Sequence, residues 1–116
     1  MICFDVYVND KKLCRAGFQD AVVLTSILSW AKLTTGEEEM FFGVGGLYHP
    51  TSGGNAHPSW VEQLAIAAGD KITIEVVNAE NPDEPVRETV ESLELIKQQK
   101  RKYLEHMKGE FENDQN

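Results

Sequence analysis

The chain has 116 residues, of which 41% are hydrophobic, and its formal net charge at pH 7 is −8. A chain of this length forms one domain rather than two, and its apolar content is sufficient for a core without metal or disulfide support. Net negative charge repels phosphate backbones and anionic lipid headgroups, which argues against nucleic acid and membranes as partners. The same charge either attracts a basic protein partner or simply keeps a small domain soluble.

The chain begins without the basic segment of a signal peptide, and no apolar run approaches the ~18 residues of a membrane span. We therefore expect a cytoplasmic protein in which Cys3 and Cys14 are buried thiols rather than a disulfide. A two-residue hairpin turn at Asn9-Asp10 would set Leu13 opposite Val6. It would also place both sulfurs on one face in diagonal positions, which disfavours a bridge.

Six segments have the residue pattern of short strands: 2–8, 13–16, 21–33, 39–44, 60–66 and 71–77. The clearest are 2–8 and 71–77, in which apolar and polar residues alternate. Segment 21–33 also fits a helical stripe, but its β-branched residues favour a long strand that is covered on both faces near its middle. Six strands with frequent turns predict a mainly β fold, α+β at its margin, in the form of an antiparallel β-sandwich or open barrel.

The predicted organisation is a β-rich core domain over 1–78, a polar hinge with two prolines over 79–86, and a C-terminal amphipathic helix over 87–116 with a frayed end. All three parts belong to one domain. The apolar stripe of the helix predicts that it packs on the core or on a second subunit. Lys100 lies inside this stripe, so it either extends its apolar stem along the core or meets an acidic group of a partner.

Residues 45–59 contain four glycines and two prolines and predict a long loop. Tyr48 and Trp60 bracket this loop and are candidates to face a flat ligand, although core packing is the usual role of tryptophan. His49 and His57 lie within the loop, but no zinc-binding spacing accompanies them, so no metal or other cofactor is expected. The glycines at 43–46 lack the lysine and helix of a phosphate-binding loop, and indicate a bulge or a close approach of another strand.

No pattern in the sequence assigns a catalytic residue, and enzymatic activity is not expected. Size and charge favour a non-catalytic interaction protein that presents its acidic surface, the 45–59 loop and the helix to a protein partner, as immunity proteins and inhibitors do. The candidate ligand- or partner-facing residues are Tyr48, His49, His57, Trp60 and Lys100. A homodimer through the C-terminal helix is a further expectation. The alternative is a small-ligand-binding or enzymatic β-domain with its site under the 45–59 loop.

Overall fold

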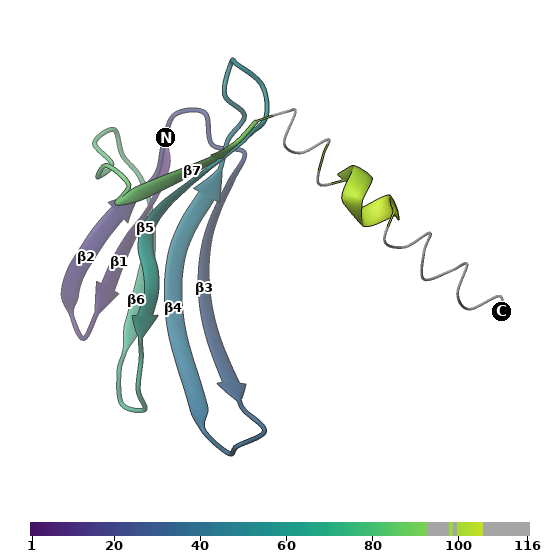
Figure 1. Ribbon diagram of the computed structural model, residues 1–116. Helices are drawn as coiled ribbons and strands as arrows, with labels where there is room; N and C mark the ends of the chain where they lie inside the picture. The colour runs from purple at the N-terminus through teal and green to yellow at the C-terminus, as the bar shows by residue number, and fades with distance from the viewer. Residues whose placement is uncertain (93–97, 99, 106–116) are drawn as a thin grey trace, which may run out of the picture.

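The computed structural model describes residues 1–92, 98 and 100–105 and folds them mainly into antiparallel β-structure, as the sequence predicted (Figure 1). These residues form two sheets, with the strand orders β2-β1-β6 and β3-β4-β5-β7. The strands are β1 (Ile2–Val8), β2 (Lys11–Ala16), β3 (Val23–Lys32), β4 (Glu38–Leu47), β5 (Asn55–Ala65), β6 (Ile72–Asn78) and β7 (Arg87–Glu91). The described part therefore has one strand more than the six predicted.

The β1–β2 hairpin turns at Asn9 and Asp10, which have the left-handed φ values of 52° and 66° that a two-residue hairpin turn requires. The predicted turn is confirmed, but the predicted register is wrong. Leu13 is an extra residue in β2, so Cys14 rather than Leu13 pairs with Val6. As a result Cys14 faces the core and Cys3 lies on the opposite face of the sheet, with both thiols buried and free.

Segment 21–33 is a strand, β3, and the helical alternative is wrong. The expectation that its middle is covered on both faces is also wrong, because Ile27 and Leu28 are 59% and 56% exposed. The physical reason is position: β3 is the edge strand of the four-stranded sheet. Figure 1 shows the β3–β4 hairpin reaching well beyond the β1–β2 hairpin.

The predicted loop over 45–59 is mostly strand, so this prediction is wrong. Strand β4 continues to Leu47, and β5 begins at Asn55. Glycine suits this position because a β-carbon at Gly45 would lie 3.1 Å from the carbonyl oxygen of Pro58, closer than an ordinary van der Waals contact. The register of β4 and β5 also shifts at this point. The interpretation of these glycines as a bulge with close strand approach is thus confirmed.

The helix predicted to begin at Arg87 does not begin there, because Arg87–Glu91 is strand β7 and pairs with β5. The open edge of β5 offers unpaired backbone groups, and a segment with Thr89 and Val90 suits a strand. Residues 98 and 100–105 are helical, and Tyr103 and Leu104 are exposed. The rest of the predicted helix, at 93–97, 99 and 106–116, lies outside the described residues. In the described ranges no helix is both long and apolar enough to cross a membrane.

The connection between β6 and β7, predicted as a hinge over 79–86, is held to both sheets by backbone hydrogen bonds. The amides of Ala79, Asp83 and Val86 donate to the carbonyl oxygens of Met1, Arg15 and Ser59, at 2.9, 2.8 and 2.8 Å. These bonds fix the path of the segment from one sheet to the other. Its role as a hinge stays a prediction.

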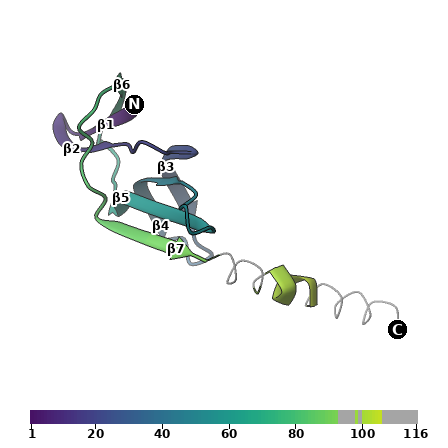
Figure 2. The same cartoon turned by 90° about the horizontal axis from the view of Figure 1, so that it is seen from above.

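The hydrophobic core draws on both sheets. Its buried members are Val6, Cys14 and Ala16 of the three-stranded sheet and Phe42, Val44 and Trp60 of the four-stranded sheet. Viewed from above, strands β1, β2 and β6 lie to one side of strands β4, β5 and β7 (Figure 2). Burying one valine or phenylalanine side chain contributes about 1.5–3 kcal/mol, so these contacts hold the sheets together.

Candidate functional site

A cavity of about 290 Å³ lies where the four-stranded sheet meets the two long connections of the chain. We call it the aromatic pocket, because three of its lining residues are Phe18, Tyr48 and Trp60. The other lining residues are Gln19, Asp20, Pro58, Pro85 and Glu88. They come from the β2–β3 connection, the end of β4, strands β5 and β7, and the β6–β7 connection, so the complete fold is needed to assemble the pocket.

Phe18 joins the three aromatic rings. Its ring stacks on Trp60 at a centroid distance of 5.8 Å and meets Tyr48 edge-on at 5.2 Å. Gly46 provides the space for it, because a β-carbon there would lie 2.8 Å from Phe18 Cε1. The glycines after residue 42 therefore shape the aromatic pocket as well as the sheet.

Trp60 is fixed by packing and by a hydrogen bond. Its side chain is buried, and its Nε1 donates to the carbonyl oxygen of Asp83 at 2.8 Å. The carboxylate of Asp83 in turn accepts a hydrogen bond from the backbone amide of Arg15 at 2.8 Å. Trp60 thus ties the β6–β7 connection, which carries Pro85, to the wall of the pocket.

The polar groups of the aromatic pocket are acidic. Tyr48 donates its hydroxyl to Glu88 Oε1 at 2.6 Å, and this bond raises the pKa of Tyr48 above its usual value. The second carboxylate oxygen of Glu88 accepts no hydrogen bond from the described residues. Asp20 is the other carboxylate in the lining, and none of the described lining residues is a lysine or arginine. The pocket therefore combines aromatic faces with negative charge.

The structure brings together two of the residues singled out from the sequence and separates the others. Tyr48 and Trp60 share the aromatic pocket. His49 is exposed, and its Nδ1 lies 3.4 Å from the carbonyl oxygen of Gly54. His57 pairs with Thr89 and lies on the opposite face of β5 from Trp60, with its Nε2 3.8 Å from Glu91. Lys100 is exposed in the helical segment.

Sequence reasoning missed Phe18 and Glu88. Phe18 follows the end of a strand with no local pattern around it, and Glu88 was assigned to a helix instead of β7. The signal that could have found Glu88 is the adjacent pair of β-branched residues Thr89 and Val90, which favours a strand over a helix.

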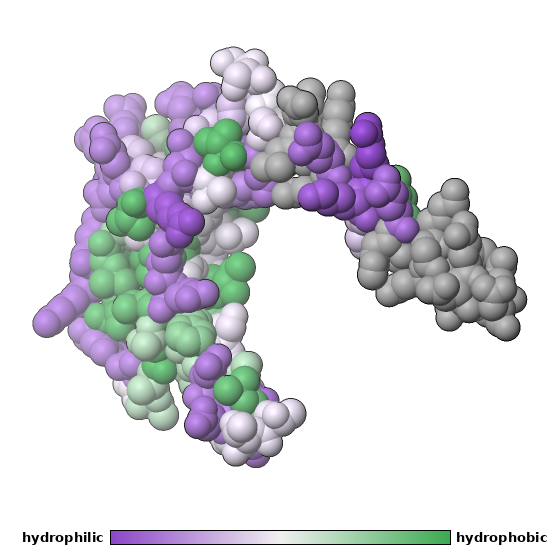
Figure 3. All heavy atoms as spheres, viewed as in Figure 1, coloured by the Kyte–Doolittle hydropathy of each residue, from purple (hydrophilic) through white to green (hydrophobic). Residues whose placement is uncertain are grey.

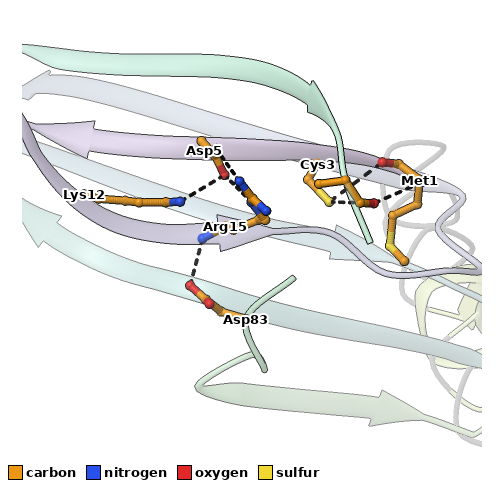
Figure 4. Close-up of polar contacts among 7 residues, drawn as sticks. Met1, Cys3, Asp5, Lys12, Arg15 and Asp83 are labelled. Atoms are coloured by element: carbon orange, nitrogen blue, oxygen red, sulfur yellow. Dashed lines mark hydrogen bonds and ion pairs between the residues drawn. The ribbon is translucent and has the colours of Figure 1, made fainter. Parts of the chain in front are cut away.

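A second polar cluster lies on the outer face of the three-stranded sheet (Figure 4). Arg15 binds Asp5 with two hydrogen bonds, from Nε at 2.7 Å and from the terminal nitrogen at 3.0 Å, and Lys12 Nζ lies 3.6 Å away. The hydrogen bond from Arg15 is the main reason that the pKa of Asp5 lies below its usual value. Because both of its oxygens are engaged, Asp5 stabilises the sheet and is not available for a ligand.

Cys14 is not suited to nucleophilic chemistry. Burial, with a smaller contribution from Asp83 and Asp5, raises the pKa of Cys14 to about 11, which keeps it in the unreactive thiol form at neutral pH. Among the described residues, no group of three histidine, cysteine or acidic side chains is arranged to hold a metal ion.

Comparison of the chain with known protein families, with characterised proteins and with solved structures found no match. Function must therefore be inferred from the geometry of the site.

Proposed function

We propose that the chain is a non-catalytic binding protein whose aromatic pocket takes a lysine or arginine side chain of a basic protein partner. The observation that carries the proposal is the lining of the pocket, in which Phe18, Tyr48 and Trp60 are combined with Glu88 and Asp20. Aromatic faces attract cations through the ring quadrupole, and adjacent carboxylates add direct charge attraction.

The polar side of the pocket is preorganised. The hydrogen bond from Tyr48 orients the Glu88 carboxylate, and the bond from Trp60 to Asp83 fixes the largest ring. A group that is already held in place loses less conformational entropy when a ligand binds. A cation–π contact contributes about 0.5–1 kcal/mol at an exposed site and about 2 kcal/mol when desolvated. One side chain bound in the pocket therefore supplies a useful part of the binding free energy of an interface.

The composition of the pocket favours binding over catalysis. Its described lining contains no serine, cysteine, histidine or lysine, and the carboxylate of Glu88 is engaged by the hydroxyl of Tyr48. The volume of about 290 Å³ is at the lower limit of small-molecule pockets, which suits a single side chain better than a metabolite. A small organic cation is the corresponding form of the alternative, small-ligand function.

The surroundings of the pocket support a basic macromolecular partner. Asp83 and Glu84 are exposed in the same connection as Pro85, and the net charge of −8 steers positively charged proteins toward the chain. We also propose that the protein acts in the cytoplasm. The proposed arrangement of its two sheets is a two-layer sandwich.

The proposal is tested by titrating the full chain with a short peptide of arginine, lysine and glycine, and with a matched peptide in which citrulline and norleucine replace the cationic residues. Glu88→Gln keeps the shape of the pocket and removes its oriented charge. Glu91→Gln is the matched control, because it removes one charge from the same strand on the opposite face. We expect Glu88→Gln to weaken peptide binding roughly tenfold and Glu91→Gln less than twofold.

Equal weakening by both variants would show that the peptide senses only net charge, and the proposal would be wrong. Equal binding of the cationic and the neutral peptide would exclude a cation site. Tight binding of a small organic cation such as Nα-acetyl-lysine amide, with no higher affinity for the peptide, would favour the small-ligand alternative.

A further inference from the structure

Strand β3 is an unprotected sheet edge. It has ten residues, its pairing with β4 is regular throughout, and its one charged residue is Lys32 at the end. Proteins usually protect an edge strand with charges, bulges, short length or a covering segment, because free backbone groups invite another strand.

The other edge strands of the described sheets carry such protection. Strand β2 has the bulge at Leu13, and Asp83 forms two hydrogen bonds with the backbone of its Arg15. Strand β7 has five residues, three of them charged, and β6 has Glu75 near its middle. The contrast indicates that the free edge of β3 pairs with another strand.

The phase of the β3–β4 ladder shows which backbone groups are free. The amide of Leu33 donates to the carbonyl oxygen of Glu37, which makes the residues at odd positions of β3 the hydrogen-bonded partners of β4. In an antiparallel ladder the alternate residues point their amide and carbonyl groups to the other side. The groups at the free edge are therefore those of the even-numbered residues: Leu24, Ser26, Leu28, Trp30 and Lys32.

Large apolar side chains accompany this free backbone on both faces of the sheet. Leu28 and Trp30 lie on the core-facing side and are 56% and 58% exposed, and Ile27 on the outer side is 59% exposed. Figure 3 shows apolar side chains, in green, at the surface on the side of the body where β3 runs. Contiguous exposed apolar residues of this size mark an association surface.

We propose that β3 pairs in antiparallel orientation with β3 of a second copy of this chain, with Leu28 on the two-fold axis. This register keeps the core-facing sides of the two sheets continuous and uses the free groups of the even-numbered residues of both copies. It sets Trp30 opposite Ser26 of the second copy and Ile27 opposite Ser29 of the second copy, so large side chains meet small ones. The two four-stranded sheets become one sheet of eight strands.

Charge, area and backbone chemistry favour a second copy as the occupant. No two charged residues face each other in this register, because Lys32 lies opposite Leu24 of the second copy. Pairing at this edge would also cover apolar area, because Ile27, Leu28 and Trp30 are 59%, 56% and 58% exposed. The helical residues 98 and 100–105 have their backbone groups committed to the helix, so they do not complete a sheet edge. A two-fold pair covers the β3 edge of each copy, so assembly through this edge stops at a dimer.

The test is the mass of the full chain in solution, measured by sedimentation or light scattering over a wide range of concentrations. We expect two copies at high concentration. Leu28→Pro removes an amide that β4 does not use, and we expect it to raise the dissociation constant roughly 30-fold or more, the effect of losing one backbone hydrogen bond from each copy. Leu28→Lys tests the same position without changing the backbone, and we expect it to give a monomer.

Two control variants separate the alternatives. Val76→Lys places the same charge on the 63% exposed position of another edge strand, and we expect it to remain a dimer. Leu104→Lys, in the helical segment, should also leave the dimer intact. Far-UV circular dichroism and thermal unfolding verify that each variant is folded. A wild-type monomer at every concentration, growth beyond two copies, or a dimer broken by Leu104→Lys and kept by Leu28→Lys would overturn the proposal.

Discussion

Strands β4 and β3 differ sharply although they are neighbours in one sheet. Phe42 and Leu28 are direct cross-strand partners on the same face, yet Phe42 is 1% exposed and Leu28 is 56% exposed. The two tryptophans show the same contrast, since Trp60 is 5% exposed and Trp30 is 58% exposed. In each pair both residues are large and apolar, so residue type does not explain the difference in exposure. The difference follows from whether the residue lies under the three-stranded sheet. The covered strands build the core and the aromatic pocket, and the open edge is left for association.

The largest difference is expected from truncating the Phe42–Leu28 pair. Phe42→Ala creates a cavity in the core and should lower the free energy of unfolding by about 3–5 kcal/mol. Leu28→Ala removes a side chain that is mostly in water in the monomer, and should cost less than about 1 kcal/mol. Urea unfolding at low protein concentration measures both values. Similar losses for the two variants would mean that β3 is covered in the monomer.

The strands could be predicted from the sequence because their pattern is local. Alternation at period two identified residues 2–8 and 71–77, and β-branched residues in 21–33 outweighed its helical stripe. Coverage could not be predicted, because it depends on which strands the second sheet overlies. The bulge at Leu13 escaped for a related reason: one extra residue changes the face of every residue after it, and no local signal marks it.

The next prediction concerns the outer face of the three-stranded sheet, where Asp5 is inaccessible because Arg15 and Lys12 bind it. Asp5→Asn leaves the Arg15 guanidinium without its charged partner and should cost about 2 kcal/mol near neutral pH. Since the folded-state pKa of Asp5 lies below the ordinary 3.8, its contribution is complete above about pH 4 and is lost as the pH falls through the lowered pKa.

Chemical unfolding of both proteins as a function of pH tests this prediction. The difference in stability between wild type and Asp5→Asn should be constant near neutral pH and should shrink in acid. A difference that is independent of pH down to strong acid would show that the pair contributes no charge-dependent stability.

The candidate site was only partly predictable. Tyr48 and Trp60 could be found because they bracket the glycine-rich segment, and they do meet in one pocket. His57 shared that segment but not the pocket, because 55–59 is strand and alternate residues point to opposite faces. His49 lies in the connection between β4 and β5, where it is exposed. Phe18 and Glu88 come from distant parts of the chain, and only the pairing of β5 with β7 brings Glu88 to the site.

A smaller effect is expected at the Tyr48 phenol. The hydrogen bond to Glu88 raises its pKa, so Glu88→Gln should lower it toward the usual value, while Glu91→Gln should leave it unchanged. Ultraviolet titration of the phenol signals at alkaline pH measures the shift. An unchanged titration curve in Glu88→Gln would mean that the hydrogen bond between Tyr48 and Glu88 does not persist in solution. The Glu88 carboxylate would then not be preorganised for a ligand.

The two tasks assigned to the covered pocket and the open edge are tested most directly by the indole N–H signals in a two-dimensional NMR spectrum, because the chain has two tryptophans, one in each part. Adding the basic peptide should shift the Trp60 signal and leave the Trp30 signal unchanged. Diluting the protein should shift the Trp30 signal and leave the Trp60 signal unchanged. A peptide that shifts Trp30 alone, or neither signal, would contradict the pocket as the binding site.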